Sequence, residues 1–333
     1  MKKFLNDPVN FVDEMLEGIY RAHPELTFVD NDKRCMVTAN VKPGKVGIAT
    51  GGGSGHLPLF LGYIGEGMID GAAVGGVFQS PSSEQMYQVT KAIDQGAGVL
   101  YIYGNYSGDI INFDMAAELA DLDGIIVKQV VGNDDVASSV VGEEHKRRGV
   151  AGIFFVYKTA GAAAANGLSL DEVTRLADKA RLRTRTMGVA LSSCVVPEIG
   201  HATFSIGEDE MEIGMGIHGE PGISRKKLAS ADALIDELME RIFAEQTYAK
   251  GDEVAVLVNG LGGTPLEELY IMFRRVSQLF DQRGVKVRHV WVGEFATSME
   301  MAGASVSVLH LDEELEPLIA ASANTPFFKH FAG

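Results

Sequence analysis

The sequence predicts an α/β protein of two domains, a three-layer parallel-sheet domain over residues 1–184 and a mixed-sheet α/β domain over residues 185–333. The chain has 333 residues, which is more than one hydrophobic core usually supports. Its first half alternates short apolar runs with helical segments, which is typical of βαβ units. Its second half has strand-like runs with few helices between them, which favours a mixed sheet with helices on one face.

The strand candidates of the first half are short, apolar and not alternating in polarity. Strands of a parallel sheet have this pattern because helices cover both of their faces. The candidates are residues 46–50, 72–75, 99–103, 125–131 and 153–157. Helices are expected between them. Ser80 and Pro81 offer an N-cap followed by a first-turn proline, and Asp109 precedes the periodic run 110–122.

A capping box at Ser169 and Glu172 predicts the last helix of the first domain. The strand candidates of the second half are residues 188–194, 212–217, 254–259, 286–292 and 306–311. Its clearest helices are expected over residues 232–248 and after a second capping box, formed by Thr264 and Glu267.

Composition excludes several classes of function. The net charge of −16 argues against a nucleic-acid or anionic-membrane partner, because no basic surface would neutralise phosphates. Cys35 and Cys194 form no C-x-x-C pair, which favours a reducing compartment, and we expect a cytoplasmic protein. No stretch approaches the length of a membrane-spanning helix. There is no H-E-x-x-H motif or carboxylate cluster, so we expect no metal site.

Three loops framed by glycine each carry an ionisable residue. They are residues 51–56 with His56, residues 104–109 with Asp109, and residues 215–222 with His218. The first two loops follow strands of the predicted parallel sheet. Carboxyl ends of parallel strands meet at one edge of a sheet, where ligands bind. We therefore expect these loops to lie together, with His218 facing them from the second domain.

Each of these residues also has a simpler interpretation. The glycine loop lacks the third glycine of a dinucleotide fingerprint, because His56 stands there, and it lacks the lysine of a P-loop. It could be a tight turn with a solvent-facing histidine. Asp109 could be a helix N-cap. His218 could end a strand in a glycine-rich turn, with Glu220 orienting the backbone or the imidazole.

Four motifs resemble the substrate-binding K subunit of dihydroxyacetone kinases. They are G-G-G-S-G-H at 51–56, N-Y-S-G-D at 105–109, G-I-H-G-E-P-G at 216–222, and N-G-L-G-G-T-P-L-E-E-L-Y at 259–270. The resemblance is collinear from residue 1 to about residue 332. It implies two α/β domains, a homodimer, and phosphorylation of the terminal hydroxyl of a short ketose.

The resemblance also implies roles for the motif residues. His218 would form a covalent hemiaminal with the substrate ketone, and Asp109 and His56 would be the acid/base pair around the hydroxyl that is phosphorylated. The backbone of Gly53, Ser54 and Gly55 would hold substrate oxygens. A neutral imidazole adds to a carbonyl but not to glycerol, so this bond would separate ketoses from polyols.

A kinase chain without a nucleotide motif needs a phosphoryl donor from elsewhere. In the family, a separate all-helical L subunit carries ATP or ADP with magnesium, and in some members a phosphotransferase-system M protein recharges it. We therefore expect this chain to bind no cofactor itself and to act with an L subunit. The alternative is a catalytically silent ketose sensor that acts with a transcription regulator. Such a sensor would need His218 but neither Asp109 nor His56.

The sequence departs from the family pattern at Leu57, Gly76 and Gly104, where most relatives have Glu, Glu and Lys. Both carboxylates and the lysine are absent together, so no buried charge is left without a partner. We expect the space of the missing lysine to admit an extra hydroxymethyl group, which favours a four-carbon ketose such as erythrulose. The alternative is that water fills this space and dihydroxyacetone remains the substrate.

Overall fold

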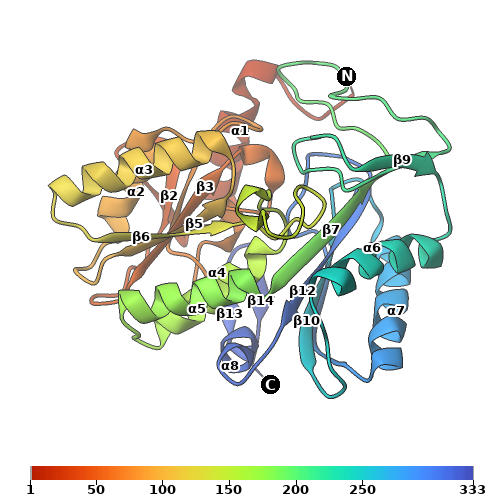
Figure 1. Cartoon of the computed structure of the whole chain (residues 1–333). Coiled ribbons are helices and arrows are strands. Elements are labelled where there is room, and N and C mark those ends of the chain that lie inside the picture. Colours follow the sequence, from red (N-terminus) through yellow and green to blue (C-terminus); the bar gives the residue numbers. More distant parts are fainter. Residues whose placement is uncertain (1, 333) are drawn as a thin grey trace.

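The structure is a computed structural model that describes residues 2–332 and contains two six-stranded sheets, the first drawn orange to yellow and the second green to blue in Figure 1. The predicted α/β class is confirmed. In order across it, the first sheet consists of β1 (Leu26–Val29), β2 (Asp32–Thr38), β4 (Gly71–Val74), β3 (Gly47–Gly52), β5 (Val99–Gly104) and β6 (Val127–Gly132).

The first sheet is parallel from β4 to β6, as predicted, but it has an antiparallel edge. Strands β1 and β2 form a hairpin, and β2 pairs antiparallel with β4. The hairpin turns at Asp30 and Asn31, which have φ values of 54° and 60°. Asp and Asn tolerate this left-handed conformation, which tight hairpin turns require.

Helices cover both faces of the first sheet, as a three-layer domain requires. Helices α2 (Ser83–Ile93) and α3 (Ser107–Leu122) pack on one face, and α1 (Phe11–Ala22), α4 (Ile153–Ala165) and α5 (Leu170–Leu182) pack on the other. Ser82, not Ser80, caps α2, because the Ser82 hydroxyl accepts from the Gln85 amide at 3.2 Å. The Ser80 hydroxyl instead accepts from the Asn112 amide group.

The strand predicted at residues 153–157 is wrong, because these residues begin helix α4. Every residue of α4 except Ala165 is buried. Its core cluster includes residues from both sheets, so α4 packs between them. A helix buried on all sides shows no polar period, and a short apolar run therefore does not distinguish it from a buried strand.

The second sheet is mixed, as predicted. Across it lie β11 (Lys286–Gly293), β10 (Glu253–Gly260), β12 (Gly303–His310), β7 (Thr184–Ala190), β8 (Glu210–Ile213) and β9 (Ser224–Lys227), and only β10 and β11 are parallel. Helices α6 (Ala231–Glu245) and α7 (Leu266–Arg283) cover one face, and α4 and α8 (Leu315–Ala320) cover the other. Helices thus lie on both faces, not on one.

Two local predictions in the second half are also wrong. The strand expected over residues 212–217 ends at Ile213, because Gly214 has a φ of +79° and starts a turn. The capping box at Thr264 does not form. Its hydroxyl donates to the Gly303 carbonyl at 2.7 Å, and α7 begins at Leu266 without a side-chain cap.

The C-terminal segment returns to the first sheet. A short hairpin of β13 (Ala323–Asn324) and β14 (Lys329–His330) lies beside residues 62–66, and Asn324 forms a bridge with Glu66. The buried Lys158 of α4 donates to the carbonyls of Leu318 and Ala321. Burial lowers the pKa of Lys158 to about 8. The domain boundary near residue 184, where β7 begins, stays a prediction.

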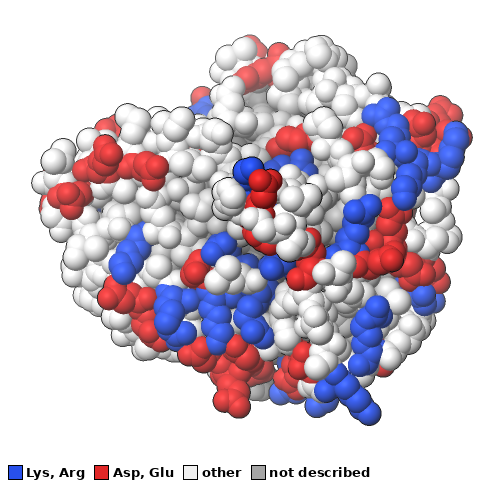
Figure 2. Space-filling view, in the orientation of Figure 1, with Lys and Arg blue, Asp and Glu red and all other residues white. Residues whose placement is uncertain are grey.

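Acidic and basic side chains are interspersed on the face shown in Figure 2. The basic group over α5 is paired with acidic neighbours: Arg175 and Lys179 contact Glu314 and Asp312. Within residues 2–332, no helix has both the length and the apolar character needed to cross a bilayer.

Candidate active site

The glycine loop after β3 packs against the loop after β4. The amides of Ser54 and Gly55 donate to the carbonyls of Gly76 and Val77 at 3.0 and 2.7 Å. A Cβ on Gly53 would lie 2.4 Å from the Val77 carbonyl oxygen, so only glycine allows this approach. The amides of Ser54 and Gly55 are therefore already used within the protein. Of the six residues expected to bind substrate, Gly53, His56, Asp109 and His218 line the cavity described below, and Ser54 and Gly55 do not.

His56 ends the glycine loop and is 1% exposed. Its Nδ1 lies 2.7 Å from the carbonyl oxygen of Thr297, which arrives from the second half of the chain. A carbonyl only accepts, so Nδ1 carries the proton and Nε2 carries the lone pair. Nε2 has no partner in the described residues. Burial lowers the pKa of His56 to about 3, with a further lowering by His218, so the ring is neutral.

Asp109 lies in the first turn of α3 and is not its N-cap, which is Tyr106. Asp109 is 8% exposed, and its Oδ1 has no partner within residues 2–332. Burial raises the pKa of Asp109 to about 6, against smaller lowering effects of Ser80 and His218. A carboxylate with this pKa is largely ionised at neutral pH and accepts a proton more readily than an ordinary aspartate.

His218 stands in the turn after β8. Its Nδ1 lies 2.8 Å from Oε1 of Glu220, and its backbone amide donates to Oε2 of the same carboxylate at 2.9 Å. Burial raises the pKa of Glu220, but the hydrogen bonds from the side chain and amide of His218 outweigh it and lower the pKa to about 2. Glu220 is thus ionised and holds the proton on Nδ1, which leaves Nε2 of His218 as the nucleophilic nitrogen.

These side chains meet in one small cavity, as the loop positions predict. The ring of His218 lies edge-on to the rings of His56 and Tyr106, with centroids 4.7 and 4.6 Å apart. Phe78 stacks on His56 at 5.0 Å. The cavity measures about 20 Å³ and is lined by Gly52, Gly53, His56, Leu59, Phe60, Gly104, Tyr106, Asp109, Gly149, Val150, Ile153, Ile217 and His218. A nucleophilic imidazole, a neutral imidazole and a carboxylate thus converge on a space for about one water.

Sequence reasoning missed several residues of the site. The Thr297 carbonyl sets the tautomer of His56, yet a backbone oxygen 241 residues away leaves no signal in a sequence. Phe78 and Tyr106 supply the apolar walls beside the two imidazoles. Tyr106 stands within the N-Y-S-G-D motif, so the motif itself was the available signal.

No group of three or more potential metal ligands occurs in the part of the chain that the structure describes. A larger cavity of about 440 Å³ lies at the amino ends of β3 and β4, far from the residues above in the fold. Two of its lysines are already paired: Lys45 contacts Asp70 at 2.5 Å, and Lys42 contacts Glu66 at 3.0 Å. The unpartnered groups therefore identify the smaller cavity as the candidate active site.

The family model described as the Dak1 domain matches residues 17–327. The chain is 47% identical over 331 residues to the PTS-dependent dihydroxyacetone kinase 2, dihydroxyacetone-binding subunit DhaK, of Listeria innocua, and the match covers 99% of each chain. It is 43% identical to the D-erythrulose kinase of Mycolicibacterium smegmatis, over 99% of this chain and 57% of that protein.

Two solved structures have a closely similar fold. The dihydroxyacetone kinase of C. freundii in complex with AMP-PNP and Mg²⁺ is 31% identical with a TM-score of 0.91, over 99% of this chain and 61% of that chain. The dihydroxyacetone kinase operon co-activator Dha-DhaQ is 32% identical with a TM-score of 0.89, over 96% of this chain and 98% of that chain.

Proposed function

This chain belongs to the Dak1 domain family, and on that basis we propose that it is the ketose-binding subunit of a two-component kinase. One observation carries the proposal. Nε2 of His218, Nε2 of His56 and Oδ1 of Asp109 reach one buried cavity, and the last two have no partner within residues 2–332. A nucleophile for a ketone and a base for a hydroxyl are the two groups that such a subunit needs.

In the proposed reaction, Nε2 of His218 adds to the ketone carbon of the substrate. A C–N bond forms, the C=O π bond opens, and the oxygen takes up a proton. Attack makes the ring cationic, so its Nδ1 proton passes to the Glu220 carboxylate and from there to solvent, while solvent supplies the proton on the oxygen. The adduct is then a neutral hemiaminal and the protons balance. Glycerol has no carbonyl and forms no such bond. The adduct therefore selects ketoses and fixes the terminal hydroxyl in place.

Asp109 then serves as the base for that hydroxyl. As the hydroxyl oxygen attacks the incoming phosphoryl group, its proton passes to the carboxylate, which contributes about 10²–10⁴-fold to the rate. Nε2 of His56 is unprotonated and is proposed to accept a hydrogen bond from another hydroxyl of the adduct. A neutral acceptor there adds no second negative charge beside Asp109.

The phosphoryl donor is proposed to reside on a separate L subunit, which would bind ATP or ADP with Mg²⁺. The sequence has no P-loop, and several relatives are named as dihydroxyacetone-binding subunits of PTS- or PEP-dependent kinases. The same proposal includes recharging of the L subunit by a phosphotransferase-system M protein. It also includes a homodimer of this chain. A ketose sensor acting as co-regulator is less well supported, because a sensor needs no buried base such as Asp109.

The substrate is proposed to be a ketose of three or four carbons, since relatives are named as dihydroxyacetone and erythrulose kinases. The space beside Gly104 is not empty, however. A Cβ at this position would lie 2.9 Å from a ring carbon of Tyr106, and one at Gly76 would lie 2.6 Å from Oε1 of Gln79. Room for a fourth carbon therefore requires the Tyr106 ring to move.

The proposal is tested by mixing the purified chain with a purified L subunit, ATP and Mg²⁺. We expect a sugar phosphate from dihydroxyacetone or erythrulose and none from glycerol. His218→Ala should abolish the preference for ketose over glycerol. Absence of product from every short ketose, with an L subunit that is active beside another K subunit, would overturn the proposal. The ratio of kcat/KM for the two ketoses decides the substrate size.

A further inference from the structure

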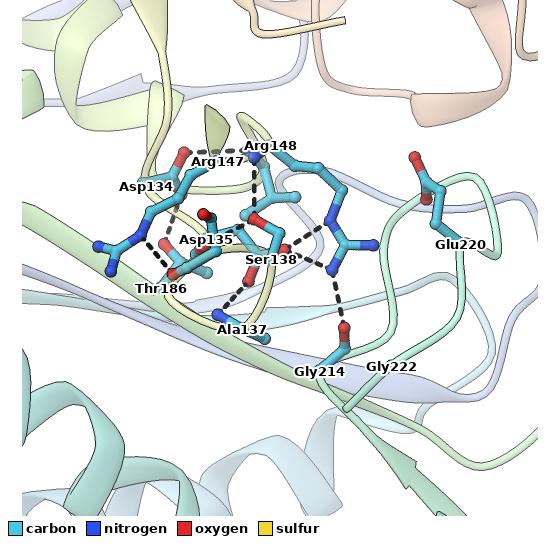
Figure 3. A network of polar contacts seen from close by, with 12 residues as sticks. Asp134, Asp135, Ala137, Ser138, Arg147, Arg148, Thr186, Gly214, Glu220 and Gly222 are labelled. Atoms are coloured by element: carbon cyan, nitrogen blue, oxygen red, sulfur yellow. Dashed lines mark hydrogen bonds and ion pairs between the residues drawn. The ribbon is translucent and has the colours of Figure 1, made fainter. Parts of the chain in front are cut away.

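The segment between β6 and α4 links the first sheet to the second. It contains two adjacent buried aspartates (Figure 3). Asp134 accepts from the amides of Val150 and Gly152 at 2.9 and 2.8 Å, which fixes the start of α4, and from the hydroxyl of Thr186 on β7. Asp135 instead faces Arg148, whose Nε donates to its carboxylate at 2.9 Å. The segment is thus a rigid bridge, not a loose linker.

Arg148 extends from this bridge to the turn that carries His218. Its Nη2 donates to the carbonyl of Gly214 at 2.9 Å, at the point where β8 ends (Figure 3). A Cβ on Gly216 would lie 2.6 Å from Nη1 of Arg148 and 2.1 Å from Oε2 of Glu220. The guanidinium and the Glu220 carboxylate therefore both occupy the space where a Cβ of residue 216 would stand, two residues before His218.

We propose that Arg148 is a positioning residue that holds the His218–Glu220 pair in place for attack on the ketone. This inference rests on the proposed function and deepens it. The guanidinium joins Asp135, on the bridge, to the Gly214 carbonyl, on the turn, through two separate N–H groups. The turn has glycine at 214, 216 and 219, and the backbone hydrogen bonds on either side of His218, from Gly216 to Glu220 and from Gly219 to Gly216, join residues of the turn only to one another.

The geometry requires arginine at this position. A guanidinium presents its N–H groups in one rigid plane, so it bonds to Asp135 and Gly214 simultaneously. A lysine ammonium is a single point at the end of a flexible chain and does not reproduce both contacts at the same positions. The side chains of Arg148 and Asp135 are 14% and 4% exposed, so water competes little for either contact.

The neighbouring Arg147 provides a matched control. It lies on the same bridge and also uses two N–H groups, donating from Nε to the Ser139 carbonyl at 3.0 Å and from Nη2 to Glu245 at 2.9 Å. It makes no contact with the turn that carries His218. Arg147→Lys and Arg148→Lys therefore make the same chemical change to the same bridge, but only the second reaches the nucleophile.

The test measures adduct formation directly, with dihydroxyacetone labelled with ¹³C at its carbonyl carbon. Conversion of the ketone carbon to a tetrahedral carbon on the protein reports the hemiaminal by NMR, without a partner subunit. For Arg148→Lys we expect the equilibrium constant for adduct formation to fall by about 10- to 100-fold, since a displacement of the His218 nucleophile by about 1 Å has effects of this size. Arg147→Lys should stay within about twofold of the unmodified protein.

With an L subunit present, Arg148→Lys should raise KM more than it lowers kcat. The acid limb of the pH–rate profile should stay in place, because Asp109 is not touched. Asp135→Asn, which removes the anchor of Arg148, should reproduce these effects and serves if Arg148→Lys does not fold. Full adduct affinity in both variants, or equal losses in Arg147→Lys, would overturn the inference. Absence of an adduct in the unmodified protein would instead overturn the proposed function on which the inference rests.

Discussion

Asp109→Asn replaces one oxygen of a buried carboxyl group by an NH₂ group, and we expect it to raise stability while lowering activity. Burial raises the pKa of Asp109 from 3.8 to about 6. Between these values the native protein binds a proton that the unfolded chain has lost, so stability falls as the pH rises. Above pH 6 the ionised carboxylate lowers the free energy of unfolding by about 3 kcal/mol, and at pH 5 by about 1.5 kcal/mol.

Asparagine does not ionise, so the variant should exceed the unmodified protein in stability by about these amounts, more at pH 7 than at pH 5. Urea unfolding at the two pH values measures the difference. The kcat of Asp109→Asn at pH 7 should be about 10²–10⁴-fold lower than that of the unmodified protein. The kcat of the unmodified protein should itself fall about tenfold per pH unit below pH 6, as Asp109 becomes protonated. Asp114→Asn, on the exposed side of the same helix, is the control and should change neither the free energy of unfolding nor kcat.

A stability difference that is equal at the two pH values would refute the assigned pKa. A kcat for Asp109→Asn within about threefold of the unmodified protein would refute the role of Asp109 as the base. The two outcomes are independent, because the first needs no partner subunit and the second needs no unfolding.

Three further changes test other parts of the structure. Glu220→Gln keeps an acceptor for Nδ1 of His218 but removes the charge, so steady-state kinetics should show kcat/KM falling about 10- to 100-fold; an unchanged value would show that the reaction does not need the negative charge of Glu220. Gly104→Lys forces its Cβ against the Tyr106 ring, so urea unfolding should show a loss of about 1–3 kcal/mol, and an unchanged stability would mean that the ring moves freely. The folded pKa of Lys158, about 8, lies below its usual value of 10.5, so the stability of the unmodified protein should rise by about 2 kcal/mol from pH 8 to pH 10. Lys158→Met should lack this rise. Urea unfolding midpoints at the two pH values measure it, and an unmodified protein without the rise would contradict the lowered pKa of Lys158.

The meeting of the loops could be predicted from the sequence because strand order decides it. Strands β3 and β5 are parallel neighbours, so His56 and Asp109, which follow them, emerge at the same edge. His218 could be placed opposite them because the sequence predicts that it follows a strand of the second domain. Residues 153–157 could not be assigned in the same way, because their burial comes from two sheets at once and not from their own periodicity.

The hydrogen-bond partners of helix caps, loop amides and imidazoles were the least predictable features. Ser80 and Ser82 are both good N-cap residues, and the Gln85 side chain decides between them. The expectation that the amides of Ser54 and Gly55 face the substrate was incomplete, because it left out the neighbouring loop whose carbonyls take both amides. Such choices depend on contacts between distant segments, and one sequence does not contain them.

The bond between His56 and the Thr297 carbonyl has a consequence for how the chain is made. The two residues are 241 positions apart, and a ribosome adding 5–20 residues per second needs roughly 12–50 s to cover that distance. During this interval the glycine loop exists without the carbonyl that selects its tautomer. A nascent chain halted before residue 297 lacks this carbonyl, so its His56 imidazole is free to carry its proton on either nitrogen. The tautomer that leaves Nε2 unprotonated is therefore fixed only late in synthesis, after residue 297 has been added.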